Sequence, residues 1–164
     1  MTAGEIHQKA KERFAEQVSD LSDKVLDPYF LVKPEVIKNV CRYLKEDPTL
    51  ALDCLSNMSG VDYLKEGKIQ VVYHLYSYTH RHKVVLKVDL SRDNPVMPTV
   101  EDIWKAANWQ EREIYDLLGV TFTGHPDLRR LLMPEDWPGH PLRKDFVEPE
   151  EYHGISTRRE SLLK

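Results

Sequence analysis

The stretch Lys68–Leu90, KIQVVYHLYSYTHRHKVVLKVDL, decides the fold of this chain. Apolar and polar side chains alternate in it with a period of two, which predicts two strands, Lys68–Tyr78 and Lys83–Leu90. The link between them, Thr79–Arg81, is short enough for an antiparallel hairpin. Because this alternation leaves one face polar, we expect a sheet that is covered on one side only.

The segments before this hairpin show strand and helix patterns in turn. Leu50–Met58 alternates loosely and indicates a further strand, which Ser59-Gly60 is expected to close. Pro28–Val32 is a short β-type run. Pro34 suits the first position of a helix, because the N–H group that proline lacks would have no partner there. We therefore expect a strand, a helix and a strand ahead of the hairpin.

The first residues carry a single apolar stripe. Apolar side chains recur at spacings of three and four among Lys, Glu and Gln: Ile6, Ala10, Phe14, Val18, Leu21 and Val25. This period predicts an amphipathic helix over residues 1–26. Such a helix packs on its own domain or docks on a partner, and the pattern fits both.

Two further helices are predicted after the hairpin. Thr99 is expected to cap the first of them. Asn108 is expected to cap the second, with Glu111 reaching back to the cap from the third helical position. Gly119 then supplies a left-handed stop. Val120–Phe122 is a candidate for a last short strand.

This order of elements predicts an α+β fold. Runs of strands with helices kept to one face indicate a two-layer domain with a small mixed β-sheet, which we expect over residues 1–124. From residue 125 onwards no period of 3.6 or 2 would bury the apolar side chains in a regular element. Residues 125–164 are therefore predicted to form an extended, Pro-rich docking arm and tail.

The composition of this arm supports docking. Five of the ten prolines lie between residues 108 and 149. Charged groups such as Arg129-Arg130 alternate there with large apolar side chains such as Trp137. Arg and Trp are enriched at interface hot spots. Prolines reduce the entropy that an extended segment loses when it docks. A surface that contacts only water would need neither the large apolar side chains nor the prolines.

The charges of the helix after Asn108 have three interpretations. Arg112 and Asp116 are four residues apart, so these side chains can pair on a solvated face. Alternatively, Glu111 is a half-buried carboxylate that orders a neighbouring chain. A free-standing acid–base enzyme would use Glu111, Glu113 and Asp116, but it would need a pocket and shifted pKa values. The sequence shows neither.

The composition excludes several other functions. The chain has 164 residues and a net charge of −4, which fits one soluble domain without a nucleic-acid footprint. Cys41 and Cys54 form no Cys-x-x-Cys pair, so an iron–sulfur cluster is not expected. His125 and His140 lie next to Gly and Pro and lack a metal-ligand spacing. No apolar run reaches the roughly 18 residues that cross a bilayer, and Met1–Phe14 lacks the apolar stretch of a secretory signal.

Three strings carry a resemblance to a known family: Ala107–Asp116 (ANWQEREIYD), Gly124–Arg130 (GHPDLRR) and Met133–Phe146 (MPEDWPGHPLRKDF). From about Val25 to Phe146 the chain resembles the family of the C subunit of NADH-quinone oxidoreductase, the respiratory complex I. The J subunit of the chloroplast-type complex is similar. A match of this length and order is far more specific than a single short motif.

The resemblance implies a non-catalytic structural or assembly subunit in the peripheral arm of this proton-translocating NADH dehydrogenase. Its partners would be the large D subunit of the quinone site and the neighbouring iron–sulfur B and I subunits. FMN, iron–sulfur clusters and quinone are then expected on those partners, with no cofactor in this chain. The protein would lie peripherally on the cytoplasmic side of the bacterial inner membrane and touch the membrane only through partner subunits.

The residues expected at the subunit interface, all as structural contacts, are Glu111, Arg112, Glu113, Asp127, Arg129, Arg130, Trp137, Leu142, Arg143, Lys144, Asp145 and Phe146. One alternative keeps the fold and places the chain in a complex I-like membrane-bound hydrogenase or other dehydrogenase. The free-standing acid–base enzyme is an alternative of a different class. Turnover by the purified chain would favour the free-standing enzyme. Co-purifying redox subunits would favour a subunit of complex I or of a complex I-like enzyme.

Overall fold

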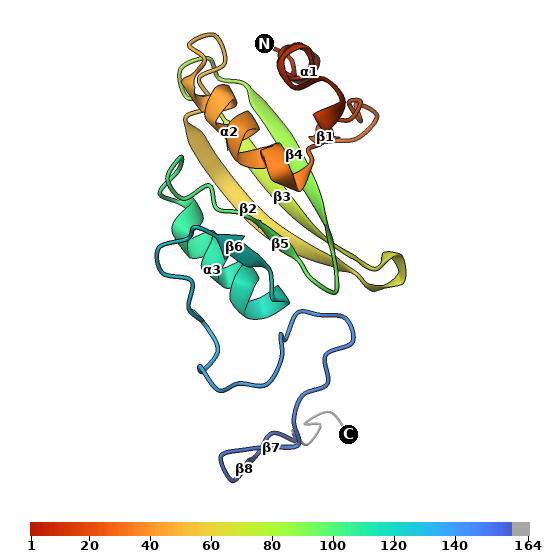
Figure 1. The fold of residues 1–164 in the computed structure, drawn as a ribbon, viewed down its shortest axis with the longest axis vertical. Coiled ribbons are helices and arrows are strands. Elements are labelled where there is room, and N and C mark those ends of the chain that lie inside the picture. The colour runs from red at the N-terminus through yellow and green to blue at the C-terminus, as the bar shows by residue number, and fades with distance from the viewer. Residues whose placement is uncertain (159–164) are drawn as a thin grey trace.

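The computed structural model describes residues 1–158, and its main sheet has four strands in the order β1–β4–β3–β2 (Figure 1). These strands are β1 (Tyr29–Leu31), β2 (Cys54–Tyr63), β3 (Lys68–Tyr76) and β4 (Lys83–Ser91). β1 runs parallel to β4, and the pairs β3–β4 and β2–β3 are antiparallel. The predicted mixed sheet and its central hairpin are therefore confirmed.

Within residues 1–158, three α-helices accompany the sheet: α1 (Ala3–Phe14), α2 (Ile37–Glu46) and α3 (Ala107–Leu118). Single 3-10 turns lie at η1 (Ala15–Gln17), η2 (Pro34–Val36) and η3 (Leu64–Glu66). Two small sheets complete the fold, a parallel pair of β5 (Val96–Pro98) with β6 (Thr121–Thr123) and an antiparallel pair of β7 (Glu151–Tyr152) with β8 (Ile155–Ser156). The predicted last strand thus exists as β6, outside the main sheet.

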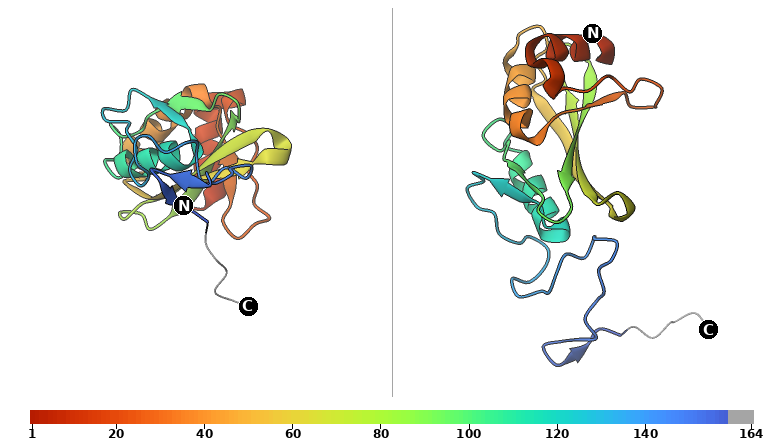
Figure 2. Two further views of the ribbon diagram at one scale, coloured as in Figure 1. Left: turned by 90° about the horizontal axis from the view of Figure 1, so that it is seen from below. Right: turned by 45° about the vertical axis from the view of Figure 1, so that its right-hand side comes forward.

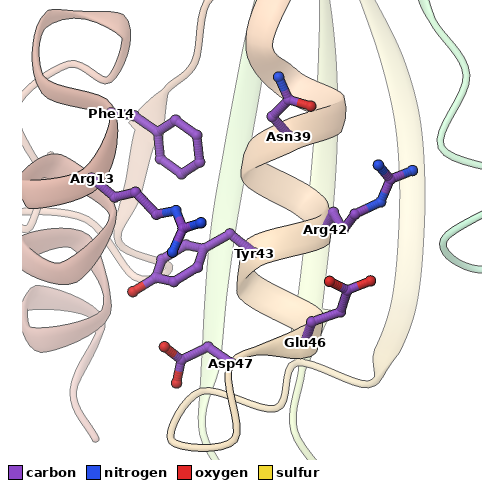
Figure 3. A pocket seen from close by; sticks show the side chains of 7 residues that line it. All are labelled: Arg13, Phe14, Asn39, Arg42, Tyr43, Glu46 and Asp47. Atoms are coloured by element: carbon purple, nitrogen blue, oxygen red, sulfur yellow. The ribbon is translucent and has the colours of Figure 1, made fainter.

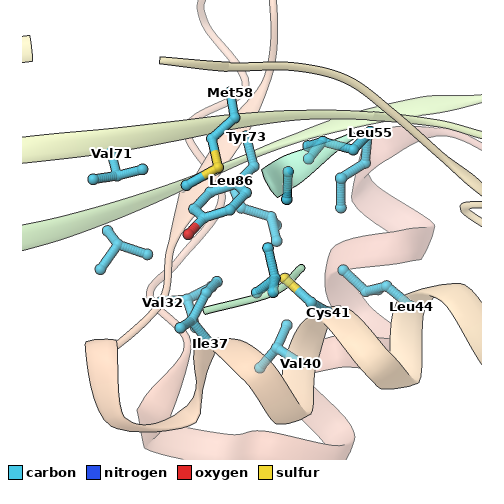
Figure 4. Close-up of a cluster of buried hydrophobic side chains, with 14 of the residues drawn as sticks. Val32, Ile37, Val40, Cys41, Leu44, Leu55, Met58, Val71, Tyr73 and Leu86 are labelled. Carbon is cyan, nitrogen blue, oxygen red and sulfur yellow. The ribbon is translucent and has the colours of Figure 1, made fainter. Parts of the chain in front are cut away.

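The helices lie on one face of the main sheet, as predicted (Figure 2). On α1, the His7 ring lies 5.2 Å from the Phe30 ring of β1. α2 packs under the inward side chains of β2 and β3, among them Met58 and Tyr73 (Figure 4). α3 crosses β2 at Gly60, where a Cβ atom would lie 2.3 Å from a methyl carbon of α3. Within residues 1–158 the opposite face carries no helix.

The core forms where α2 meets this inward face. Four α2 side chains are fully buried against the sheet: Ile37, Val40, Cys41 and Leu44. Burying an aliphatic side chain of this size contributes about 1.5–3 kcal/mol. Cys41 is therefore a small core hydrophobe, and burial raises the pKa of its thiol above the ordinary value. Cys54, in contrast, is only half-buried at the start of β2.

The N-terminal helix is shorter than the predicted span of residues 1–26. It ends at Phe14, because Ala15 has a φ of 47°, in the left-handed region that L-residues rarely adopt. Val18 then forms an isolated antiparallel bridge to the residue that follows β1. Val25 is 48% exposed and lies outside the core. The regular spacing of apolar residues in the first 26 positions therefore spans two structures, a helix and then a β-bridge, and not one helix.

Two other strand and helix predictions are corrected. The strand expected at Leu50–Met58 begins at Cys54 and runs through Gly60 to Tyr63, because a glycine inside a strand is tolerated where another backbone or helix comes close. No helix follows Thr99; residues 101–106 form turns instead.

The start of α3 is also corrected, whereas its end is confirmed. The helix begins at Ala107 with Ala106 as N-cap and has no side-chain cap, so the predicted capping box of Asn108 and Glu111 is wrong. Gly119 ends the helix with a φ of 77°, as expected.

Residues 125–158, which we call the C-terminal segment, contain only the short β7–β8 hairpin as regular structure. The chain loops around the end of α3 before it reaches this hairpin (Figure 1). Residues 159–164 of the predicted arm lie outside the described part of the chain. Among residues 1–158, no helix combines the length and apolarity that crossing a membrane requires.

Candidate protein-interaction site

Most of the predicted interface residues gather around α3, which has three different sides. Ile114 and Leu118 are buried and face the core. Arg112 and Asp116 face the C-terminal segment, to which Arg112 donates and from which Asp116 accepts hydrogen bonds. Glu113 is exposed on the third side. The helix therefore connects the core to the C-terminal segment.

Glu111 is fully buried and orders a segment of its own chain. Its carboxylate accepts hydrogen bonds from the Thr99 hydroxyl and, at 2.8 Å, from the Val100 N–H. Burial raises the pKa of Glu111 to about 7, although both donors oppose this shift. The prediction of a solvated charge is wrong here. The alternative was a half-buried carboxylate that orders a neighbouring chain, whereas Glu111 is fully buried and orders the turn that follows Thr99 in its own chain.

His125 fixes the chain directly after β6. Its Nδ1 accepts from the Asp127 N–H at 3.0 Å, so its Nε2 carries the proton and donates to the Asn108 carbonyl oxygen at 3.2 Å. Its ring is enclosed, and Nε2 lies 4.0 Å from the Glu111 carboxylate. This histidine caps a turn.

Arg112 pairs with the C-terminal segment and not with Asp116. Its guanidinium donates to the carbonyl oxygens of Arg129 and Arg130, at 3.3 and 3.5 Å. It also lies 3.8 Å from the Asp127 carboxylate. The predicted ion pair along the helix is therefore replaced by contacts that hold the segment against α3.

Asp116 is the strongest of these attachments. One carboxylate oxygen accepts from three consecutive backbone N–H groups, those of Leu131, Leu132 and Met133, at 3.0, 2.7 and 2.9 Å. The other oxygen accepts from Arg130 at 3.0 Å. Burial alone would raise the pKa of Asp116, but the N–H groups and Arg130 hold it below its ordinary value. The carboxylate is therefore ionised in the folded chain and binds the segment.

The C-terminal end of α3 is closed by the same segment. The Leu142 N–H donates to the Leu117 carbonyl oxygen at 3.0 Å, and Arg143 Nε donates to the Leu118 carbonyl oxygen at 2.8 Å. A cation at this position also suits the negative end of the helix dipole. His140 Nδ1 donates to a third carbonyl oxygen at 2.9 Å, and burial lowers the pKa of this histidine.

A second ion-pair cluster lies at the end of β2. The Arg92 guanidinium donates to both carboxylate oxygens of Asp62, at 2.8 and 3.1 Å, and lowers the pKa of Asp62. Asp62 also accepts from the Lys144 N–H at 2.7 Å, and Asp145 pairs with Arg92. The sequence analysis did not predict this cluster. Its signal is Asp62 itself, an acidic residue two positions after Gly60 and therefore on the inward face of β2.

The remaining predicted residues point in several directions. Asp127 and Arg129 pair at 3.0 Å near the surface, where an ion pair contributes little. The ring of Trp137 lies 4.9 Å from that of Tyr152, and its Nε1 is covered without a hydrogen-bond partner. Phe146 packs beside Gly139, where a Cβ atom would lie 3.2 Å from the ring.

Large apolar side chains remain exposed on α3 and the C-terminal segment: Trp109, Leu132, Leu142, Val147 and Ile155. They lie on the same segments that the buried carboxylates hold in place. An apolar surface of this kind marks an interaction site. Whether each predicted residue contacts a partner stays a prediction.

A separate cavity lies away from this surface, between the first two helices. A groove of about 520 Å³ lies between α1 and α2, where Arg13 stacks over Tyr43 at 4.6 Å and Arg42 pairs with Asp102 at 3.0 Å (Figure 3). Its charges are already paired or solvated. Within residues 1–158, no three His, Cys, Asp or Glu side chains gather as metal ligands.

Comparison with protein families gives one clear match. Residues 30–152 match the family described as the respiratory-chain NADH dehydrogenase 30 kDa subunit. The C subunit of NADH-quinone oxidoreductase from Roseiflexus castenholzii is 53% identical over 109 residues, which cover 66% of this chain and 63% of that protein. The C subunit from Chloroherpeton thalassium is 45% identical over 147 residues, which cover 88% of this chain and 61% of that protein. The chain thus spans about three fifths of these relatives.

A relative of similar length also matches, as do two solved structures. The C subunit from Chlorobium phaeobacteroides is 42% identical over 88% of this chain and 89% of its own. A trypsin-resistant fragment of Nqo5 has a TM-score of 0.60 at 27% identity, over 76% of this chain and 97% of the fragment. A chain of a membrane-bound sulfane sulfur reductase, an archaeal respiratory membrane complex, has a TM-score of 0.68 at 30% identity, over 87% and 84%.

Proposed function

Because the chain belongs to the family of the respiratory-chain NADH dehydrogenase 30 kDa subunit, we propose that it is a structural subunit of the peripheral arm of a proton-pumping NADH:quinone oxidoreductase. In this role it performs no chemistry of its own. It holds a partner subunit in place through the surface formed by α3 and the C-terminal segment.

One observation carries this proposal beyond family membership. Asp116 uses both of its carboxylate oxygens on the Leu131–Met133 backbone and Arg130, which leaves the Leu132 side chain 61% exposed. Burying an ionised carboxylate is unfavourable unless it gains such partners. Pre-ordering an apolar segment in this way lowers the entropy lost on docking.

The proposed partners are the large D subunit of the quinone site and the iron–sulfur B and I subunits. FMN, iron–sulfur clusters and quinone are assigned to such partners, because this chain has two cysteines and an iron–sulfur cluster usually takes four thiolates. The protein would associate with the cytoplasmic side of the bacterial inner membrane through these partners.

The proposal also assigns different roles to the two parts of the chain. The predicted domain, residues 1–124, supplies the fold, and the C-terminal segment supplies the contacts. Within residues 1–158, the three α-helices and the four-stranded sheet all lie in the predicted domain, whereas the C-terminal segment contains only the β7–β8 hairpin as regular structure. This supports a stable domain followed by a separable segment.

A second candidate function has its own support. The sulfane sulfur reductase chain is the more similar of the two solved structures in TM-score, and the name of its respiratory membrane complex gives a different activity. A complex I-like dehydrogenase or hydrogenase would use the same scaffold with another electron donor. Redox subunits that co-purify with the chain identify the donor.

The free-standing acid–base enzyme finds no support in the geometry. Glu111 has a raised pKa, but its carboxylate is fully enclosed and bonded to Thr99 and Val100. Asp116 is occupied by four donors, and the Glu113 side chain is exposed to solvent. The three carboxylates therefore do not converge on one site.

The test is purification of the tagged full-length chain from solubilised membranes. We expect co-purification with flavin- and iron–sulfur-containing subunits and release of the chain from membranes by chaotrope or alkali. Recovery of the chain alone, with all of it in the soluble fraction, would contradict the proposal. Retention in the bilayer after the wash would contradict its peripheral placement.

A further inference from the structure

The two edge strands of the main sheet differ in whether their outer backbone groups are paired. The outer edge of β1 is covered by its own chain, through antiparallel bridges that join Val18 to Val32 and Ser22 to Tyr29. β2 forms the other edge, and no backbone hydrogen bond within residues 1–158 joins its outer side to another segment. Proteins ordinarily cover or interrupt such an edge, because its N–H and C=O groups can pair with another chain.

A side-chain cavity of about 180 Å³ follows this open edge. Four consecutive residues of β2, Asn57–Gly60, line it together with side chains of α3. Because successive side chains of a strand point to opposite faces, a cavity that touches four in a row must lie along the edge. Leu142 of the C-terminal segment closes one end.

The α3 wall of this groove supplies both apolar surface and charge. Ile114, Leu117 and Leu118 line it, and the exposed Glu113 lies at its rim. The cavity is smaller than the roughly 300 Å³ or more that is typical of small-molecule sites, so a single side chain suits it better. Gln110 lies on the same side of α3 by helical spacing, and its covered Oε1 has no hydrogen-bond partner.

We propose that the groove between the β2 edge at Asn57–Val61 and α3 binds an extended strand of a neighbouring subunit. The strand adds to the sheet by backbone hydrogen bonds. One of its apolar side chains enters the cavity beside Leu117, and an adjacent Lys or Arg meets Glu113. A β-bulge between Leu55 and Asn57 limits regular pairing to the part of β2 that follows it.

This inference rests on the proposed function, because the strand comes from a partner in the same complex. It adds a contact at the β2 edge to the surface formed by α3 and the C-terminal segment. The occupant is an extended backbone, because a strand can pair with the row of β2 N–H and C=O groups that docking would otherwise separate from water. A helix would cover the apolar side chains and leave those groups unpaired.

The test compares backbone hydrogen exchange of β2 in the purified full-length chain and in the intact complex from solubilised membranes. We expect alternate amides within Asn57–Val61 to exchange at least about tenfold more slowly in the complex. The full-length variants Leu117→Lys and Glu113→Lys should lower the recovery of the complex. Leu26→Lys, which changes a side chain that is 96% exposed far from the groove, is the matched control.

The outcomes separate this inference from the proposed function. If the chain is recovered in the complex but the β2 amides exchange at the same rate as in the purified chain, the strand inference is wrong and the subunit role stands. Protection of α3 without protection of β2 would mean that a different element docks, which also overturns it. β2 protection in a purified dimer would assign the edge to a second copy of this chain. A chain that joins no complex would contradict both proposals.

Discussion

At the scale of single residues, Glu111 makes the stability of the protein depend on pH. The unfolded carboxyl titrates near 4.5, and burial raises the folded pKa to about 7. Between these values the folded chain keeps a proton that the unfolded chain releases, so stability falls as pH rises through this window. The loss is on the order of 3 kcal/mol at most, because each pKa unit corresponds to about 1.4 kcal/mol.

We therefore predict that Glu111→Gln removes much of this pH dependence. The amide keeps the shape of the neutral acid and still accepts from the Val100 N–H. Thermal unfolding between about pH 4.5 and pH 8 would measure the effect, with Glu113→Gln as a control on the exposed side of the same helix. An unchanged pH slope in Glu111→Gln would show that another group titrates. Glu111→Ala should cost about 3 kcal/mol, because it leaves both buried donors unpaired.

Asp116 controls how firmly the C-terminal segment is held. Asp116→Asn removes the charge and turns one acceptor into a donor that faces the Leu131–Met133 amides and Arg130. We expect the attachment to weaken by about 2 kcal/mol, since hydrogen bonds to a charged group contribute about 1.5–3 kcal/mol. Local opening should then speed tryptic cleavage after Arg129 and Arg130 by at least about tenfold. Equal cleavage of Asp116→Asn and a Glu113→Gln control would contradict this role.

The partners of these charges could be predicted from the sequence only in part. Residue types and helical spacing singled out Glu111 and Arg112 as interface residues, and Asp116 only as a partner of Arg112 or a candidate catalytic carboxylate. They also favoured a local Arg112–Asp116 pair, because four-residue spacing is visible in a sequence. The real partners, Thr99 for Glu111 and residues 130–133 for Asp116, lie 12 or more positions away and depend on how the chain turns.

At the scale of elements, the spacing of apolar side chains along the sequence predicted the strands better than the helices. The hairpin of β3 and β4 follows from alternation, which a sheet imposes along its whole length. The helix expected over residues 1–26 fails at Ala15, because spacing of three and four continues into a segment that packs through a bridge. No helix follows Thr99, although its hydroxyl accepts from the Glu101 N–H as a cap would. The same hydroxyl and the Val100 N–H donate to the buried Glu111 carboxylate, which attaches this segment to α3.

The contact between α3 and β2 depends on the missing side chain of Gly60. A Cβ atom there would lie 2.3 Å from Leu118 Cδ1 and 3.2 Å from Ile114 Cγ2. We expect Gly60→Ala to destabilise the protein by about 1–3 kcal/mol through overpacking. Chemical denaturation would measure it, with the neighbouring Ser59→Ala, on the other face of β2, as a control expected to change stability by less than about 0.5 kcal/mol.

A second substitution separates overpacking from a backbone effect at the same glycine. Gly60→Ala combined with Leu118→Ala makes room for the added methyl group, so the two costs should not add. A double variant that is as unstable as the sum of the single variants would mean that Gly60 is needed for its backbone conformation.

At the scale of the whole molecule, the question is whether the fold needs the C-terminal segment. The sequence predicted an arm that lies on another protein, whereas residues 125–145 bind their own α3 through Asp116, Arg112 and the last helical carbonyl groups. A sequence without a regular period cannot show whether such a segment binds another protein or its own domain. Neither helix nor strand geometry then indicates which distant residues it contacts. The segment is thus both attached to the domain and a source of exposed apolar side chains.

We predict that a chain ending at Pro138 folds but does not assemble. It keeps every strand of the main sheet and the Asp116 contacts to residues 130–133. It loses Leu142, Arg143 and Lys144, whose partners are the Leu117 and Leu118 carbonyl groups and the Asp62 carboxylate. Those acceptors lie at the end of α3 and beside Arg92, so water can replace most of the lost donors and the core stays intact.

The truncated chain should therefore retain near-native circular dichroism and one cooperative thermal transition at a lower Tm. On native gels of solubilised membranes it should be absent from the large complex. Full-length Leu132→Lys is the companion variant, because it keeps every hydrogen bond of the segment and changes only an exposed side chain. Normal assembly of both variants would show that the segment is a tail without a docking role, and failure of the truncated chain to fold would place residues 139–145 in the core of the domain.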